Sequence, residues 1–535
     1  MSWQLNDNLI CRRILLIAAL LVGAVLFWLL HAGRTVTLQR EEISADGAVG
    51  YASDSRRDAP DAARKKTSRS RWPAAGKDAA QERRTVLLKV DSAEEFNRIL
   101  EWSQAAGIPV KGKIEGLRWI KVAVTLRQAE MLARQIEDAV EFCEDVEMRI
   151  PQYLDDIYPP WQGDPGPAFG TSYLAALGVD AADEDRGRGV LVAVLDTALM
   201  GHDEFLEADI LQVDTGLHAG DERTNDHGTA VTSLLCGRNG VSRASVLAYP
   251  VLDANGCGSA FDAAAAIVAA ADAGAKVISM SFGAYSPSPI LQEAVEYAAE
   301  KGALLVAAAG NNGVAELCYP AAYEKVIAVG AVDAGMNAAG FSNYGENLDV
   351  AAPGVGLLAA TANEAYGAFT GTSAAVPCVA GVLANWLAAN PGSSAGDAAA
   401  ALLENCNFNG QNASGNGVVD QWRMLNGNTP GIRDVAVNAI HGDRENEEIT
   451  VMVQNCTAEE NAVTLSLTLN GKKWQGETMT LPPNECVAAI VKIPGKIADA
   501  AGTVTVNATV DMVDPNLMDA RPENQSRTAV LKAGE

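Results

Sequence analysis

Leu191-Val-Ala-Val-Leu-Asp196 is the stretch of this sequence that decides its fold. Its apolar residues run without polar alternation, which indicates a strand buried on both faces of a helix-covered parallel sheet. Similar apolar runs follow and alternate with alanine-rich segments of helical length. The other strand candidates are Val246–Val251, Val277–Met280, Leu304–Ala308 and Val326–Val329, and the helix candidates include Asp262–Ala273 and Pro289–Lys301. We therefore predict an α/β domain, residues 165–428, whose mostly parallel sheet is flanked by helices.

Four polar residues lie at the ends of these strands or in the loops between them. Asp196 directly follows the first strand, and Asn311 follows another in Ala307-Ala-Ala-Gly-Asn311. His227 lies in Asn225-Asp-His227-Gly-Thr, and Ser373 lies in Gly371-Thr-Ser373-Ala-Ala-Val-Pro377. Because parallel sheets place ligands at the carboxyl ends of their strands, we expect these side chains to meet there.

An acid, a base, an amide and a hydroxyl together are the parts of a nucleophilic acyl-transfer site. The hydroxyl of Ser373 becomes a nucleophile only when an imidazole accepts its proton, and a carboxylate must hold that imidazole in the required tautomer. The oxyanion that forms needs donors already aimed at it. Ser373 precedes an apparent helix, Ala374–Leu387, so its N–H would be one donor, and Asn311 would supply the other.

The order of these motifs along the chain resembles the subtilisin-like serine peptidases, or subtilases. The resemblance implies a serine endopeptidase, a hydrolase that cleaves peptide bonds of extracytoplasmic proteins through an Asp-His-Ser triad and an acyl-enzyme intermediate. Asp196, His227 and Ser373 would form the triad, and Asn311 would line the oxyanion hole. His227 is the one histidine of five that lies in the matching motif, so no other residue competes for the role of base.

Four positions depart from the pattern of that family. Ala198, Ala230, Ala374 and Cys378 stand where subtilases usually have Gly, His, Met and His. None of the usual residues carries proton transfer, so hydrolysis remains the expected activity. Two alternatives stay open. One is a catalytically inactive subtilase-fold protein that binds peptides or mediates adhesion, and the other is a transferase or ligase in which an amine resolves the acyl-enzyme.

The resemblance also implies a groove for extended peptide or protein substrates. Ser281-Phe282-Gly283 resembles the edge that pairs with the substrate backbone, and Gly256-Cys-Gly258 resembles the opposite rim, for which a plain turn is the alternative. Glycines let a peptide approach closely and add as a strand. The residues expected around the side chain next to the scissile bond are Ala308, Ala309, Gly310 and Cys318. Since none is a carboxylate, we expect a small or medium apolar side chain there rather than a basic one.

The amino-terminal part of the chain carries two further predictions. Residues 14–30 form an apolar run that would span roughly 25 Å as a helix. Residues 1–34 are therefore predicted to be a signal anchor, with a cleaved signal peptide as the alternative, so the chain would be exported and anchored in a membrane through residues 14–30. Residues 35–84 are polar and patternless, which predicts a disordered linker.

Residues 85–152 are predicted to form a β-α-β-β-α-β unit, the split βαβ plan. Ser92-Ala-Glu-Glu95 and Thr125-Leu-Arg-Gln128 are capping boxes that would open its two helices, and a last strand is expected near Val140–Ile150. Placed before a subtilase domain, the unit resembles the family's propeptide, an intramolecular inhibitor, although an unrelated interaction module is the alternative. Its last strand would thread the groove, with cleavage expected between Met148 and Gly170.

Residues 429–535 show the period-two alternation of strands rather than a helical pattern. Val463, Leu465, Leu467 and Leu469 alternate with polar residues, and Pro482-Pro-Asn has the composition of a turn. The segment is predicted to be an all-β sandwich, and it resembles the Ig-like modules appended to exported enzymes. No motif indicates its ligand.

Charge and cysteine content limit the remaining possibilities. The formal net charge of −26 argues against a nucleic-acid partner, since phosphate binding needs clustered Lys and Arg. The nine cysteines form no CxxC motif, so no zinc site is expected, although Cys456 and Cys486 could pair across strands. No cofactor is required by the expected chemistry. Calcium is possible but unsupported, because the stretch Gly237–Ala244 is shorter than the family's calcium loop and poor in carboxylates, and Glu204 alone does not make a site.

Overall fold

The computed structural model describes residues 83–535, apart from 136–139, 152–161, 216–224, 363, 408–413, 427–433, 444–447, 458, 475–477, 484, 493–502, 514–518, 520–524 and 533–535. These residues belong to the second of two compact units of the chain, Ala75–Glu535. The first unit, Met1–Ala74, lies outside the described residues, and so does the predicted anchor or signal peptide of residues 1–34. The predicted linker, residues 35–84, also lies outside them up to residue 82.

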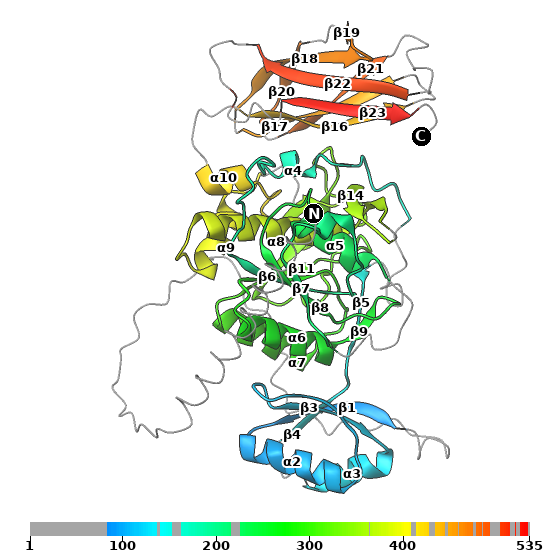
Figure 1. The fold of residues 1–535 in the computed structure, drawn as a ribbon, viewed down its shortest axis with the longest axis vertical. Helices are drawn as coiled ribbons and strands as arrows, with labels where there is room; N and C mark the ends of the chain where they lie inside the picture. The colour runs from blue at the N-terminus through cyan, green and yellow to red at the C-terminus, as the bar shows by residue number, and fades with distance from the viewer. Residues whose placement is uncertain are drawn as a thin grey trace, which may run out of the picture. The chain divides into compact units, whose positions relative to one another are not determined.

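A seven-stranded parallel sheet forms the centre of the described fold (Figure 1). Its strands, in spatial order, are β13 (Val350–Pro353), β12 (Val326–Val332), β11 (Leu304–Ala308), β10 (Val277–Met280), β6 (Leu191–Asp196), β8 (Ser245–Pro250) and β7 (Ile210–Gln212). Each neighbouring pair is parallel. The predicted parallel sheet is therefore confirmed, whereas β7 and β13 were not identified from the apolar pattern.

Helices cover both faces of this sheet. They are α5 (His227–Cys236) and α8 (Thr372–Ala389) over one core, and α6 (Ala260–Asp272) and α7 (Pro289–Glu300) over the other. Shorter elements of the domain are α4 (Tyr173–Ala176), a 3-10 turn (Asp203–Phe205), β9 (Cys257–Ser259), β14 (Leu357–Ala360), β15 (Tyr366–Phe369), α9 (Ala395–Glu404) and α10 (Gln421–Asn426). Val192 and Val194 of β6 belong to the first core, while Ala193 and Leu195 belong to the second. A strand with period-two side chains thus serves two cores, as its unbroken apolar sequence predicts.

Helix α8 runs through the middle of the domain. Among the described helices it is the one long and apolar enough to cross a membrane, but 83% of its 18-residue window is buried within the protein. It contacts α5 and strands β10 to β13, which identifies it as a core helix. Gly371 precedes it with a φ of 143°, a conformation that favours glycine. As a result, Ser373 lies in the first turn of a helix anchored in the core.

Residues 84–143 form a separate antiparallel sheet with two helices. The elements are β1 (Arg84–Val90), α2 (Ala93–Ala105), β2 (Val110–Ile114), β3 (Trp119–Val124), α3 (Leu126–Gln135) and β4 (Val140–Cys143), with sheet order β2-β3-β1-β4. Ser92 caps α2 by accepting the N–H of Glu95, and Thr125 and Gln128 bond reciprocally before α3. The single strand expected near Val140–Ile150 is wrong. It is divided into β4, which pairs with β1, and β5 (Glu147–Arg149), which pairs with β9.

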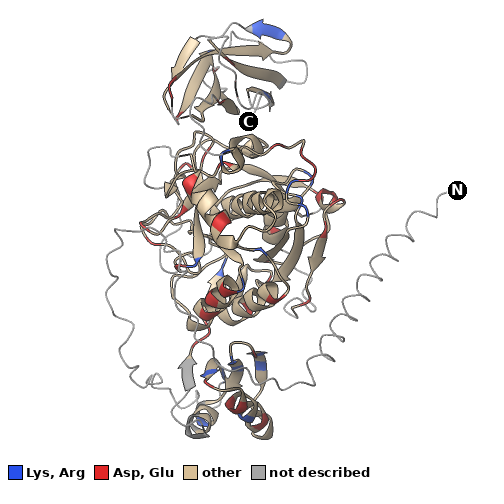
Figure 2. Ribbon diagram, turned by 90° about the vertical axis from the view of Figure 1, so that its left-hand side faces the viewer, with Lys and Arg blue, Asp and Glu red and all other residues tan. Residues whose placement is uncertain are grey.

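This small sheet contacts helices α6 and α7 through lysines and a tryptophan. Nε1 of Trp119 donates to Oε2 of Glu293 at 3.1 Å, and Lys89 pairs with the same carboxylate. Nζ of Lys121 lies 3.2 Å from Oδ2 of Asp262. Figure 2 shows the acidic residues of the chain in red, several of them on these two helices. Charge attraction as well as apolar burial therefore holds the small sheet against α6 and α7.

The carboxy-terminal residues form two antiparallel sheets around one apolar core. One sheet has the order β16 (Val435–Asp443), β17 (Glu448–Asn455) and β21 (Cys486–Lys492). The other contains β19 (Lys472–Trp474), β18 (Asn461–Leu469), β22 (Thr503–Met512), β23 (Ser526–Lys532) and β20 (Thr478–Leu481). Val463, Leu465, Leu467 and Leu469 all lie in the core between them. The Ig-like class remains a prediction, and the described cysteines, Cys456 and Cys486 included, form no disulfide.

Candidate active site

Asp196 and His227 meet at the edge of the sheet where β6 ends. Asp196 is the last residue of β6, and His227 is the first residue of α5. Nδ1 of His227 lies 2.8 Å from Oδ1 of Asp196, and both side chains are buried. Because the carboxylate can only accept a hydrogen bond, Nδ1 is the donor of this bond, and Nε2 is the ring nitrogen that faces away from Asp196 and could accept a proton.

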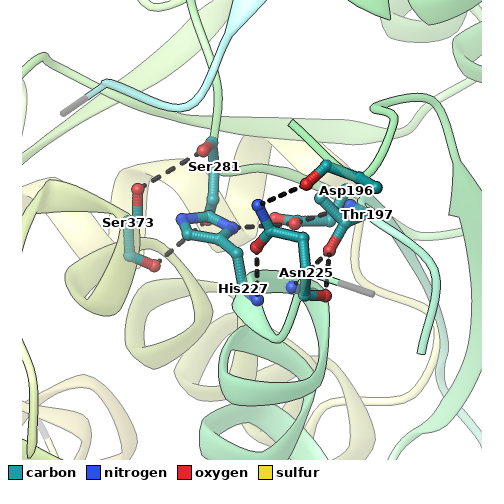
Figure 3. A network of polar contacts seen from close by, with 8 residues as sticks. Asp196, Thr197, Asn225, His227, Ser281 and Ser373 are labelled. Atoms are coloured by element: carbon teal, nitrogen blue, oxygen red, sulfur yellow. Dashed lines mark hydrogen bonds and ion pairs between the residues drawn. The ribbon is translucent and has the colours of Figure 1, made fainter. Parts of the chain in front are cut away.

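Neighbouring polar groups hold this pair in place (Figure 3). The N–H of Thr197 donates to Oδ1 of Asp196 at 2.7 Å, and Oγ1 of Thr197 accepts the N–H of Gly228 at 2.8 Å. Oδ1 of Asn225 accepts the N–H of His227 at 3.0 Å. A Cβ on Gly228 would lie 2.3 Å from the carbonyl oxygen of Thr197, so glycine lets α5 begin this close to β6.

Ser373 lies next to His227, but its hydroxyl is engaged elsewhere (Figure 3). Oγ of Ser373 donates to the carbonyl oxygen of Ser281 at 3.3 Å, and Oγ of Ser281 donates to the carbonyl oxygen of Ser373 at 3.1 Å. Nε2 of His227 is buried and has no hydrogen-bond partner in the described part of the chain. The three residues are thus brought together with the base open and the hydroxyl turned onto a backbone carbonyl.

Asn311 is oriented by the residue that precedes the serine. Its Oδ1 accepts the N–H of Thr372 at 2.9 Å and the hydroxyl of Thr372 at 2.8 Å. A backbone N–H can only donate, so the atom that faces it must be the amide oxygen, and the Nδ2 group is left to donate. Ser373 is the second residue of α8, so its own N–H has no acceptor within the helix. Nδ2 of Asn311 and the N–H of Ser373 are therefore the two candidate donors for an oxyanion.

Three residues of this site were missed by the sequence reasoning. The ring of Phe369 on β15 packs edge-on against the imidazole of His227, with ring centroids 5.3 Å apart. Thr197 and Thr372 fix Asp196 and Asn311, as described above. Thr197 follows Asp196 and Thr372 precedes Ser373 in the sequence, so their position next to predicted site residues could have identified them. Phe369 has no such signal, because its role depends on how β15 folds back.

The residues predicted to bind substrate lie along two backbone edges. We call these the two edges: Gly256–Ser259, which includes β9, and Ser281–Gly283, which directly follows β10. A Cβ on Gly258 would lie 2.1 Å from the carbonyl oxygen of Val251, and one on Gly283 would lie 2.7 Å from Cβ of Cys318. Glycine is therefore required at both positions by close approach of neighbouring atoms. Phe282, which lies between Ser281 and Gly283 in the second edge, is fully buried.

The residues expected around the substrate side chain are packed together. Ala308, Ala309 and Cys318 are fully buried, and a Cβ on Gly310 would lie 2.8 Å from Sγ of Cys318. Burial raises the pKa of the Cys318 thiol to about 12, so the thiol is neutral and does not act as a nucleophile. Tyr285 also contacts Cys318.

Strand β5 lies between the two edges and bonds to both. Met148 pairs with Gly258 of β9, and the N–H of Ile150 donates to the carbonyl oxygen of Gly256 at 3.0 Å. On the other side, Arg149 exchanges two backbone hydrogen bonds with Gly283, at 2.9 and 2.8 Å. The segment that joins the small sheet to the α/β domain is thus held as an added strand, which is how extended peptides bind to sheet edges.

The stretch Gly237–Ala244 is the possible calcium loop of the sequence analysis. Two arginines donate hydrogen bonds to its carbonyl oxygens. The buried guanidinium of Arg186 donates to the carbonyl oxygens of Gly240 and Val241, at 2.9 and 3.0 Å. That of Arg243 donates to Gly237 and Arg238 at 2.8 and 2.7 Å. Burial lowers the pKa of Arg186 to about 10, so it remains a cation at neutral pH. These carbonyl oxygens thus have guanidinium groups as their donors.

Side chains that could ligate a metal ion are dispersed among the described residues. Within them, no group of three His, Cys, Asp or Glu side chains is placed to hold a metal ion. Glu204, the other position considered for calcium, is buried, and its Oε1 accepts the N–H of Asn239 at 2.7 Å while its Oε2 accepts the hydroxyl of Tyr366 at 2.7 Å. Its carboxylate therefore joins the loop to β15.

Comparison with known proteins matches the same part of the chain. A family model described as the subtilase family matches residues 187–421, which contain all four predicted catalytic residues. Thermitase from Thermoactinomyces vulgaris is 39% identical over 234 residues, covering 42% of this chain and 82% of thermitase. Subtilisin Savinase from Lederbergia lenta is 38% identical over 215 residues, covering 38% of this chain and 78% of the relative.

A third relative is matched over a smaller part of its length. The thermophilic serine proteinase of Bacillus sp. (strain AK1) is 45% identical over 168 residues, which cover 30% of this chain and 42% of the relative. The chain thus spans less than half the length of that protein. Each of the three similarities covers less than half of this chain.

Proposed function

The chain belongs to the subtilase family of serine peptidases, and from this membership and the site geometry we propose that it is a serine endopeptidase. The observation that carries the proposal is the meeting of Asp196, His227 and Ser373, with Nε2 of His227 open as an acceptor. Asn311, whose amide is oriented by Thr372, stands beside them as a donor. Proteins or peptides would be the substrates, in keeping with two edges that already hold an extended segment.

In the proposed reaction, Ser373 first turns its hydroxyl from Ser281 to Nε2 of His227. As Oγ attacks the substrate carbonyl carbon, its proton passes to Nε2, and Asp196 stabilises the imidazolium that results. The negative charge on the carbonyl oxygen is met by Nδ2 of Asn311 and the N–H of Ser373. His227 then protonates the leaving amine as the C–N bond breaks. A water molecule, activated by the same imidazole, hydrolyses the acyl-enzyme and restores the serine.

Covalent labelling tests this proposal directly. An alkyl fluorophosphonate should modify Ser373 in the processed enzyme, from which the segment between the two edges has been removed, since the reagent needs a hydroxyl activated by a base and leaves its phosphonyl group on Oγ. Mass spectrometry of the digested protein locates the label. The Ser373→Ala variant should not be labelled, whereas Ser279→Ala, which changes a buried serine of β10, should be labelled like the parent. Absence of label on Ser373 in the parent would support the inactive peptide-binding alternative instead.

We further propose that residues 85–152 act as an intramolecular inhibitor and that the chain is exported. The inhibitor role is supported by β5, which occupies the two edges that a substrate would use. Export and anchoring through residues 14–30 rest on the sequence alone, since that segment lies outside the described residues. A small or medium apolar side chain is proposed next to the scissile bond, because Ala308, Ala309, Gly310 and Cys318 carry no charge.

We also propose that the loop Gly237–Ala244 needs no calcium. The guanidinium groups of Arg186 and Arg243 take the place that a cation would have among its carbonyl oxygens. An ion held at 100 times its Kd would stabilise the fold by about 2.7 kcal/mol, or several degrees in Tm. We therefore expect the Tm of the chain to differ by less than about 2 °C between millimolar calcium and EDTA. A larger fall in EDTA that calcium reverses would contradict the proposal.

A further inference from the structure

The segment Glu147–Pro151 is bound between the two edges as a substrate strand would be. Its inward side chains, Met148 and Ile150, are fully buried, while Glu147 is exposed and Arg149 is half-buried. Its backbone bonds to Gly283 on one side and to Gly256 on the other. Burial of alternate side chains with main-chain pairing on both sides is what an inserted peptide strand shows. The chain therefore supplies an occupant of its own site, and the register of this occupant can be read from the hydrogen bonds.

The register places a proline where the next hydrogen bond to Ser281 would form. Arg149 and Gly283 exchange both their backbone hydrogen bonds, and in an antiparallel pair such residues recur at every second position. Strand β5 ends at Arg149 and Pro151 lies in a 3-10 turn, but Ile150 still bonds to Gly256, so counting two residues on brings the nitrogen of Pro151 toward the carbonyl of Ser281. An ordinary residue there would donate its N–H to the carbonyl oxygen of Ser281. Proline has no N–H, so this carbonyl receives no donor from the bound segment.

The hydroxyl of Ser373 is the donor that the carbonyl of Ser281 receives instead, at 3.3 Å. In this orientation the hydroxyl proton points away from His227, whose Nε2 is buried and has no partner among the described residues. The Ser373 hydroxyl therefore fills the position on the Ser281 carbonyl that the N–H of another residue at 151 would take. An occupant with an N–H at this position would add a second donor to the carbonyl of Ser281, which weakens the bond of this carbonyl to the hydroxyl and favours turning of the hydroxyl toward Nε2.

We propose that Pro151 makes Glu147–Pro151 a bound but uncleaved occupant, which keeps Ser373 in a resting orientation. This inference rests on the proposed serine endopeptidase function and adds to it a regulation and a substrate class. Productive substrates are extended peptides that place apolar side chains at the positions of Met148 and Ile150. They carry any residue other than proline opposite Ser281. Removal of the inhibitory segment then requires a cut at a bond other than Pro151–Gln152.

The test is to restore the N–H in the full chain with Pro151→Ala. We expect this variant to cut its own 151–152 bond, giving a new amino terminus at Gln152, at least about tenfold faster than the parent, because the restored N–H holds the segment on the Ser281 carbonyl and loosens the bond of that carbonyl to the Ser373 hydroxyl. The double variant Pro151→Ala/Ser373→Ala should stay intact at this bond, which shows that the chain's own serine makes the cut. Pro165→Ala, a proline that lies outside the two edges, should behave like the parent.

Peptides added in trans separate this inference from the function on which it rests. A peptide of residues 145–156 should inhibit hydrolysis by the processed enzyme and remain uncut after Pro151, whereas the same peptide with alanine at 151 should be cut there. Cleavage of both peptides at similar rates, or a Pro151→Ala chain that stays uncut at the 151–152 bond although Ser373 of the processed enzyme takes the fluorophosphonate, would overturn the role of Pro151 alone. Failure of the parent and both peptides to react, with Ser373 unlabelled, would overturn the proposed function and this inference together.

Discussion

Replacing Ser373 by alanine is expected to lower kcat for peptide hydrolysis by about 10⁶-fold, the loss that subtilisin shows when its own nucleophile is removed. The change deletes the attacking oxygen and the proton that His227 would receive. The fold should be retained, since Ser373 is followed by Ala374 and Ala375 in the same buried turn and gives up one hydrogen bond, worth about 1 kcal/mol. Initial rates with an internally quenched peptide and the Tm of the full chain measure the two effects.

A buried serine close by in sequence provides the matched control for that experiment. Ser279 of β10 is fully buried, and its hydroxyl has no hydrogen-bond partner in the described part of the chain. Ser279→Ala should therefore leave kcat within about twofold of the parent, because it removes a hydroxyl without touching the reacting atoms. Hydrolysis by Ser373→Ala within tenfold of the parent would show that another group is the nucleophile.

The central sheet was predictable because each of its long strands serves two cores. Continuous apolar runs such as Leu191–Leu195 have no other stable place than between two layers of helices. The edge strand β7, with two exposed residues, carries no such pattern and was missed. Strand β5 was misplaced for a different reason. Its partner, β9, belongs to another domain, so local sequence gave no sign that the strand predicted near Val140–Ile150 would divide.

The candidate residues of the site could be found from the sequence, whereas the orientation of the Ser373 hydroxyl could not. Asp196, His227, Asn311 and Ser373 each lie in a recognisable motif, and the structure places Asp196, His227 and Ser373 near one another and Asn311 against Thr372. The direction of the Ser373 hydroxyl depends on the segment that occupies the two edges. In this chain that segment ends in Pro151, which is distant from Ser373 in sequence. Side-chain rotamers of this kind follow from tertiary contacts, so a motif cannot specify them.

The loop Gly237–Ala244 illustrates the same limit. The sequence showed that Gly237–Ala244 is short and poor in carboxylates, which argues against a calcium site. It did not show what would satisfy the loop's carbonyl oxygens. Arg186 comes from the segment before β6 and reaches the loop only in the folded chain. Buried carbonyl groups need donors, and a guanidinium with several N–H groups can supply them without a metal.

Asp196→Asn is expected to lower kcat by about 10⁴-fold while leaving KM nearly unchanged. Oδ1 of Asp196 accepts both Nδ1 of His227 and the N–H of Thr197, at 2.8 and 2.7 Å. Since the Thr197 N–H can only donate, an asparagine would keep its amide oxygen there, and the imidazole would stay in place. What is lost is the negative charge that stabilises the imidazolium after Ser373 gives up its proton.

Asp226→Asn provides the matched control for this loss, because it neutralises a carboxylate next to His227 in sequence that is exposed and makes no side-chain cap to α5. Its kcat should stay within about twofold of the parent, since exposed charges near water interact weakly with a buried ring. In Asp196→Asn, the amide NH₂ would replace Oδ2, a buried atom with no partner among the described residues, so a fall in Tm from one unsatisfied donor is also expected. Equal losses of kcat in the two variants would mean that general charge, rather than the contact of Asp196 with Nδ1, supports the base. A kcat for Asp196→Asn within tenfold of the parent would remove Asp196 from the proposed mechanism.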